Sequence, residues 1–112
     1  MALTIWHNPR CSKSRQTLAL IEAREPTVRL YLTDAPSEAE LRAAATALGV
    51  APIKMMRTGE PEFKAESLSQ DSSEDTLFAA MARMPKLIER PIVFAGEKAV
   101  IGRPPEAVLS LL

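Results

Sequence analysis

Residues 3–15 read LTIWHNPRCSKSR, a strand signal followed by a polar loop with a cysteine. Its first four residues predict a short strand, and residues 16–21 after it predict the body of a helix. Cys11, the one cysteine of the chain, lies between the two. A thiol at a helix start meets unpaired backbone N–H groups and the positive end of the helix dipole, and both favour the thiolate. Positive or potentially positive charge is added nearby by His7, Arg10, Lys13 and Arg15.

Length, charge and composition limit the class of protein. The 112 residues predict one domain, 1–112, with a single core. Basic and acidic residues balance at 14 each, so the total charge does not favour a nucleic-acid partner or an acidic membrane surface. No apolar run approaches the roughly 18 residues of a membrane span, and no signal peptide is expected. An unpaired cysteine is unusual in a secreted protein, so we expect a cytoplasmic location.

The other segments alternate between strand and helix signals. Apolar spacing predicts a helix over 13–24, which Pro26 ends, and a β-rich alternation predicts a strand over 28–32. Ser37 and Glu40 form a capping box ahead of a helix that continues to residue 48 and closes at Gly49. In the middle of the chain we expect a helical turn at 53–56, a break at 58–61, a polar loop at 67–75 and a helix at 74–84. Near the end we expect strands at 92–94 and 99–101 around a turn at 95–98, and a last helix opened by residues 102–105.

This order of elements predicts a mixed sheet. The first β-α-β unit is expected to pair its strands in parallel, and the last two strands are expected to form an antiparallel hairpin. An α/β fold with a mixed four-stranded sheet flanked by helices is the thioredoxin-like arrangement. That arrangement also puts a reactive thiol at the start of its first helix, so the organisation of the chain and the cysteine loop agree.

The cysteine loop has a reactive and an inert interpretation. Free cysteine is often buried and inert, but such a residue normally lies in an apolar stretch, whereas Cys11 has polar neighbours on both sides. Ser14 lies three residues on, where its hydroxyl can point back at the thiol. His7 either orients a hydroxyl or stabilises the thiolate, or it simply binds backbone at the strand end. N–H groups and arginines at a helix start also form a site for an oxyanion.

Several known motifs do not fit the loop. A phosphatase of the Cys-x5-Arg type needs arginine where this chain has Thr17. A phosphate loop needs glycines, and none precedes Gly49. A Cys-x-x-Cys redox pair is excluded, because its second cysteine would be residue 14, which is Ser14. The remaining pattern, Cys-x-x-Ser, is typical of a one-thiol redox enzyme. One cysteine and one histidine, without a ligand cluster at metal spacing, predict no metal site.

Four segments in order resemble a known family. They are HNPRCSKSR at 7–15, MMR at 55–57, LIERPIV at 87–93 and IGRPPE at 101–106. Together they resemble the glutaredoxin-coupled arsenate reductases of the ArsC family, most closely its short, single-domain branch. The resemblance covers essentially the whole chain. One departure lies in the loop, because many of these enzymes have Gly-Thr where this chain has Ser12-Lys13.

The resemblance implies a site and its reaction. Cys11 corresponds to the nucleophile that attacks arsenate, and an oxyanion-binding triad corresponds to Arg57, Arg90 and Arg103. His7 and Ser14 match positions that support the thiolate, Arg15 matches the arginine that closes the loop, and Pro91 matches a cis-proline that faces the cysteine. Electrons come from glutathione, a co-substrate, and from glutaredoxin, and no cofactor is bound. The arginines also make sense as bidentate ligands of a tetrahedral anion, although any one of them has the alternative of a solvated surface residue.

Other functions stay open at this point. A related thiol oxidoreductase would act on another oxyanion or on a thiol adduct. A non-catalytic regulator of the Spx type would bind a protein partner, but such regulators often carry Cys-x-x-Cys and do not need all three arginines. A monothiol glutaredoxin would share Cys-x-x-Ser, but no glycine pair follows the third predicted strand.

Overall fold

A computed structural model describes residues 2–112 as two compact units. The first unit combines residues 2–34 with residues 90–112, and the second contains residues 35–89. Each unit is described by itself below. The expectation of one domain over 1–112 stays a prediction.

The first unit contains the predicted mixed sheet. Its strands are β1 (Leu3–Trp6), β2 (Thr27–Arg29), β3 (Ile92–Ala95) and β4 (Lys98–Ile101), in the spatial order β2-β1-β3-β4. β1 and β2 are parallel, while β3 is antiparallel to both β1 and β4. The β1–β3 register pairs Ile5 with Val93 and Trp6 with Ile92, so the beginning of β3 lies beside the end of β1.

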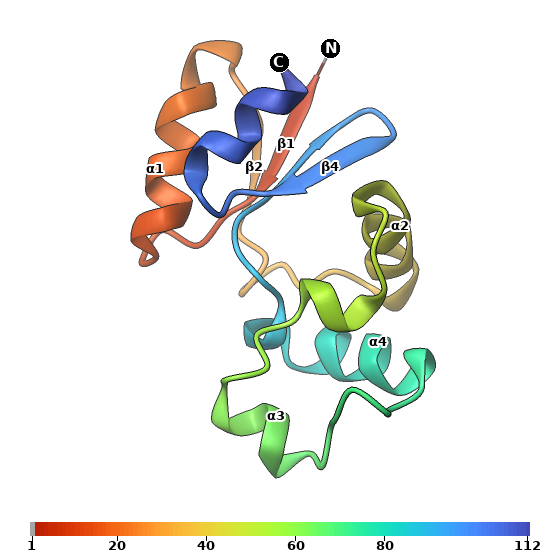
Figure 1. Ribbon diagram of the computed structural model, residues 1–112. Coiled ribbons are helices and arrows are strands. Elements are labelled where there is room, and N and C mark those ends of the chain that lie inside the picture. The colour runs from red at the N-terminus through yellow and green to blue at the C-terminus, as the bar shows by residue number, and fades with distance from the viewer. Residues whose placement is uncertain (1) are drawn as a thin grey trace. The chain divides into compact units, whose positions relative to one another are not determined.

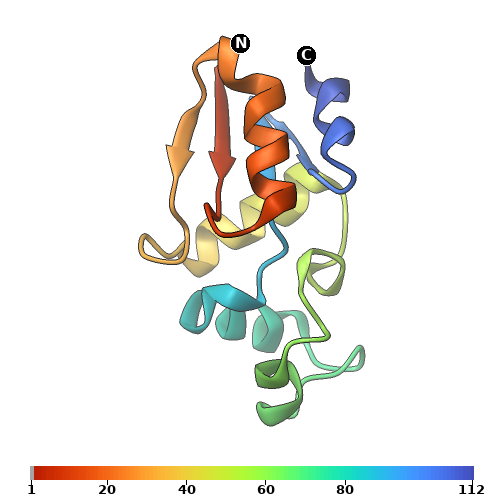
Figure 2. The ribbon, with the colours of Figure 1, turned by 90° about the vertical axis from the view of Figure 1, so that its left-hand side faces the viewer.

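Two helices cover one face of this sheet. They are α1 (Ser12–Ile21), continued by the 3₁₀ turn η1 (Glu22–Arg24), and the C-terminal 3₁₀ helix η4 (Pro105–Leu111), which lies beside α1 (Figures 1 and 2). Successive strand residues point to opposite faces, so alternate positions supply the core under these helices. That core consists of Leu3, Ile5, Ile21, Val93, Ala95 and Val108.

The second predicted strand is too long. Expected over 28–32, β2 ends at Arg29, and the chain then turns with the N–H groups of Thr33 and Asp34 both donating to the carbonyl of Leu30. The physical reason is the length of its partner. β1 ends at Trp6, opposite Arg29, and beyond that point β1 leads into the cysteine loop, so the alternation of residues 30–32 has no neighbouring strand to pair with.

The second unit is helical. It contains α2 (Glu38–Leu48), η2 (Pro52–Met55), α3 (Pro61–Ala65), α4 (Glu74–Arg83) and η3 (Pro85–Leu87). The predicted capping box is present: Ser37 Oγ accepts from the Glu40 N–H, and the Glu40 carboxylate accepts from the Ser37 N–H. Gly49 ends α2 with φ 71°, the left-handed conformation that glycine adopts without strain.

Two short helices in this unit were not predicted. The break expected at 58–61 ends where α3 begins, at Pro61, and Pro85 begins η3 in the same way. The N–H groups in the first turn of a helix have no partner within the helix, so proline, which has no N–H, fits there without loss. Proline can therefore begin a helix as well as end one. Within residues 2–112, no helix is long and apolar enough to cross a membrane.

Candidate active site

Cys11 occupies the N-cap of helix α1. Its backbone is extended (φ −98°, ψ 122°), and its carbonyl accepts the first helical hydrogen bond from the Arg15 N–H at 3.0 Å. The Cys11 N–H donates to the carbonyl of Asn8 at 3.0 Å, which closes the loop before the helix. The side chain is partly exposed, so the thiol has access to a reactant.

Two arginines from the other end of the chain meet this thiol. Arg103 Nη2 lies 3.8 Å from Cys11 Sγ, and Arg103 Nε donates to the Arg90 carbonyl at 3.0 Å. Arg90 lies just before the β3–β4 hairpin and Arg103 just after it. The two ends of the hairpin are held together by the Gly102 N–H, which donates to the Pro91 carbonyl at 2.9 Å. The Arg90–Pro91 peptide is cis, as the resemblance implied, and Arg103–Pro104 is a second cis peptide that was not predicted.

The surroundings lower the pKa of Cys11 below its ordinary value. Burial acts in the opposite direction, because it disfavours the charged form. The backbone N–H groups of Ser14 and Lys13 and the Arg90 guanidinium, through its charge and a hydrogen bond, together outweigh that effect. The helix start and a tertiary contact therefore act together to favour the thiolate more than in an ordinary cysteine.

His7 and Ser14 form a buried pair behind the thiol loop. His7 Nδ1 and Ser14 Oγ are 2.7 Å apart, and Ser14 Oγ also accepts from the Asn8 N–H at 3.0 Å. Burial lowers the pKa of His7, and the Arg15 charge lowers it further, so the imidazole is neutral near pH 7. This contact agrees with the first of the roles considered for His7, orienting a hydroxyl, and that role stays a prediction. The Ser14 hydroxyl is engaged with His7 and Asn8, and it is the backbone N–H of Ser14 that favours the thiolate.

Arg15 crosses the loop on its exposed side. Its Nη1 donates to the Pro9 carbonyl at 2.9 Å, so the first turn of α1 is tied to the segment that precedes the cysteine. This contact agrees with the expectation that Arg15 closes the loop. Binding of substrate by Arg15 stays a prediction.

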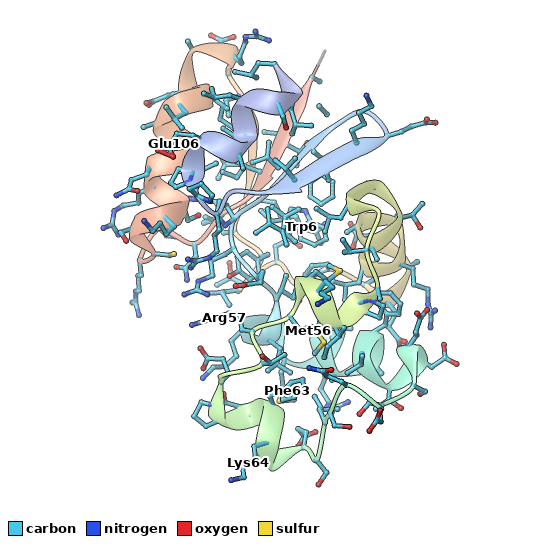
Figure 3. All side chains as sticks on the ribbon, viewed as in Figure 1. Trp6, Met56, Arg57, Phe63, Lys64 and Glu106 are labelled. Carbon is cyan, nitrogen blue, oxygen red and sulfur yellow. The ribbon has the colours of Figure 1, made fainter. Side chains whose placement is uncertain are left out.

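Arg57, the third predicted anion ligand, lies in the second unit (Figure 3). Its backbone N–H donates to the Leu87 carbonyl at 2.7 Å, and its Nη2 lies 2.5 Å from Glu60 Oε1. The structure therefore brings Cys11, Arg90 and Arg103 together within the first unit. A shared site with Arg57 stays a prediction.

The sequence reasoning missed a close contact that supports Arg103. An ideal Cβ placed on Gly102 would lie 2.5 Å from Thr17 Oγ1 and 2.8 Å from Pro91 Cγ. Glycine is therefore required where the end of β4 passes α1, directly before Arg103. A single sequence carries no signal for this contact, because Thr17 and Gly102 are 85 residues apart. Across residues 2–112, no three His, Cys, Asp or Glu side chains gather as metal ligands.

The sheet order and the position of the thiol define a thioredoxin-like fold with a single cysteine at the start of its first helix. The sequence profile of the ArsC family matches residues 6–111. The chain belongs to the ArsC family.

Relatives match over the whole length. The chain is 47% identical to an arsenate reductase of Haemophilus influenzae, with both proteins covered completely. It is 48% identical to the uncharacterized protein YfgD of Escherichia coli, over 96% of this chain and 94% of YfgD. The solved structure of an arsenate reductase from Vibrio cholerae superimposes with a TM-score of 0.94 at 49% identity, covering 100% of this chain and 98% of that one. These likenesses confirm the predicted family and the predicted fold.

Proposed function

We propose that this protein is an arsenate reductase that uses Cys11 as its nucleophile and takes electrons from glutathione and glutaredoxin. The observation that carries the proposal is the Cys11 thiol at the N-cap of α1 with Arg103 Nη2 at 3.8 Å, in a chain of the ArsC family. Full-length relatives named arsenate reductase support the choice of arsenate as the substrate.

In the first step the Cys11 thiolate attacks the arsenic of arsenate. An As–S bond forms, an As–O bond breaks, and the departing oxygen leaves as water after taking up protons. Arg57, Arg90 and Arg103 bind the remaining oxygens. Guanidinium groups present planar sets of N–H donors that suit such an oxyanion, and fixed positive charge stabilises the negative charge of the transition state.

The side chains around the loop keep this nucleophile ready. The neutral His7 holds the Ser14 hydroxyl at 2.7 Å, which fixes the start of the helix whose N–H groups favour the thiolate. Arg15 keeps the loop closed through its bond to Pro9 and contributes charge for the incoming anion. In this proposal His7 and Ser14 support the catalytic thiol, and Arg15 belongs to the substrate site.

Electrons must come from other thiols, because the chain has no second cysteine. Glutathione attacks the arsenic of the adduct, so a second As–S bond forms and a second oxygen leaves as water. A glutaredoxin thiolate then attacks the glutathione sulfur and forms a mixed disulfide, and the electron pair of the broken As–S bond stays on arsenic. Water cleaves the remaining As–S bond and releases arsenite. In balance, arsenate and two thiols give arsenite, one disulfide and water: arsenic gains two electrons, and Cys11 returns as the thiolate. We place this reaction in the cytoplasm, where glutathione keeps thiols reduced.

The test is arsenate-dependent NADPH oxidation in the presence of glutathione, glutaredoxin and glutathione reductase. We expect turnover with the wild type and none with Cys11→Ser. Arg24→Gln, in the exposed turn η1, is the matched control and is expected to leave turnover unchanged. If the wild type is inactive while its Cys11 alkylates rapidly at pH 6, arsenate is not the substrate and another oxyanion or thiol adduct takes its place.

A further inference from the structure

The second unit contains a network of four charged side chains, made up of Arg57, Glu60, Glu62 and Lys86. Arg57 Nη2 lies 2.5 Å from Glu60 Oε1, and Lys86 Nζ lies 3.8 Å from Glu60 Oε2. Lys86 Nζ also lies 3.0 Å from Glu62 Oε2. Glu60 therefore bridges two cations, one with each carboxylate oxygen, and it is the member of the network that touches Arg57 directly.

Backbone hydrogen bonds hold both ends of the Arg57–Glu60 pair. Arg57 is anchored by its bond to the Leu87 carbonyl, next to the antiparallel bridge between Met56 and Ile88. The Glu60 N–H donates to the Arg57 carbonyl at 3.2 Å, which closes a turn between the two residues. Pro61 follows at once and begins α3. The two side chains thus meet from fixed backbone positions, so forming the pair orders the side chains without ordering further backbone.

Burial sets this pair apart from an ordinary surface ion pair. The Glu60 side chain is 16% exposed and the Arg57 side chain 27% exposed, whereas Lys86 is 48% exposed. Partial removal from water reduces the screening that makes exposed pairs weak. Glu60 also occupies the N-cap of α3, but its side chain makes no capping hydrogen bond there, and both carboxylate oxygens face cations instead.

We infer that Glu60 is a positioning residue for Arg57: it holds one edge of the guanidinium and presents the other N–H donors to an oxyanion. The inference rests on the proposed function, from which it takes Arg57 as an anion ligand. A guanidinium has five N–H donors in a planar fork, so one edge binds a carboxylate while another binds a substrate. Lys86, on the second oxygen of Glu60, offsets the negative charge that Glu60 brings near that anion.

A simple charge effect and a positioning role predict opposite changes in anion affinity when Glu60 loses its charge, so the inference can be tested. Removing a carboxylate makes the region more positive and by itself strengthens anion binding. Removing a positioning group weakens anion binding, because Arg57 then samples other rotamers. Glu62→Gln is the matched control, since it removes one negative charge from the same network without breaking the Arg57–Glu60 contact.

The experiment measures anion affinity in two ways. The first is the dissociation constant of inorganic sulfate, read from protection of Cys11 against iodoacetamide, and the second is the KM for arsenate. We expect Glu60→Gln to raise both by about five- to tenfold, a size typical of coupling between contacting residues, with kcat changed less than KM. Glu62→Gln is expected to leave both at or below the wild-type values. In an Arg57→Ala background, Glu60→Gln should add no further loss.

Each outcome separates the two proposals. If Glu60→Gln behaves like Glu62→Gln, or if its effect persists without Arg57, the positioning role is wrong while arsenate reduction stands. If the wild type reduces no arsenate but sulfate protection follows the expected pattern, the positioning role stands and the substrate is wrong. If sulfate fails to protect wild-type Cys11, the positioning role is overturned. Circular dichroism of each variant verifies that it is folded.

Discussion

Arg103 Nη2 lies 3.8 Å from Cys11 Sγ although the two residues are 92 positions apart in the chain. The contact forms because α1 starts beside the sheet edge at which β4 ends. Arg103 is oriented at its other side by the bond from Nε to the Arg90 carbonyl at 3.0 Å. One guanidinium therefore links the thiol loop to the β3–β4 hairpin.

Arg90 is expected to control the ionisation of the thiol. The charge of Arg90 and its hydrogen bond lower the pKa of Cys11, so Arg90→Gln should raise that pKa. The measurement is the pH dependence of Cys11 alkylation by iodoacetamide, whose midpoint should move to higher pH. Arg24→Gln should leave the midpoint where it is in the wild type. An unchanged midpoint in Arg90→Gln would show that the helix start alone favours the thiolate.

Ser14→Ala should affect stability more than thiol reactivity. The hydroxyl bonds His7 Nδ1 and accepts from the Asn8 N–H, so its removal leaves buried polar groups unpaired at a cost of about 1–3 kcal/mol in the free energy of unfolding. The backbone N–H that favours the thiolate is still present in alanine. Urea unfolding measures the first effect and alkylation at pH 6 the second. Ser12→Ala, at an exposed position, should change stability by less than about 0.5 kcal/mol. A large loss of reactivity in Ser14→Ala would assign the hydroxyl a direct role at the sulfur.

The buried His7 should make stability depend on pH. Its pKa is lowered in the folded state, so the unfolded chain binds the proton more readily. Folding stability is therefore expected to fall as pH drops from about 6.5, the unfolded pKa, through the folded pKa. His7→Gln removes this group and should flatten the slope of unfolding free energy against pH in that window. If His7→Gln shows the same slope as the wild type, His7 is not the group that makes stability depend on pH.

Gly102→Ala should displace Arg103 from the thiol. The added Cβ would meet Thr17 Oγ1 at 2.5 Å and Pro91 Cγ at 2.8 Å, and overpacking of this kind costs about 1–3 kcal/mol. We expect lower stability in urea and slower alkylation of Cys11. Gly59→Ala is the matched control, because nothing lies within 4 Å of its Cβ position, and it should change neither measurement. If Gly102→Ala and Gly59→Ala have the same stability and the same rate of Cys11 alkylation, then α1 and β4 move apart with no loss in the free energy of unfolding.

Local signals predicted most of the elements and missed two short helices, α3 and η3. The capping box at Ser37 and the glycine at Gly49 bounded α2 correctly, since both depend on backbone groups within four residues. Pro61 was expected to belong to a break and instead begins α3, and no element was predicted where Pro85 begins η3. The strand over 28–32 was shortened because its length depends on where β1 ends, which residues 28–32 do not encode.

From the residues alone we predicted a lone cysteine between a strand and a helix, in a βαβ…ββα chain that resembles the ArsC family. The elements could be predicted because hydrophobic period and capping residues act over a few neighbours, and the family because four motifs occur in order along the chain. Tertiary structure alone decided that Arg90 and Arg103 meet Cys11, that Gly102 packs on Thr17, and that the Ser14 hydroxyl is held by His7. These contacts depend on strand register and close packing, which bring together residues that share no local pattern.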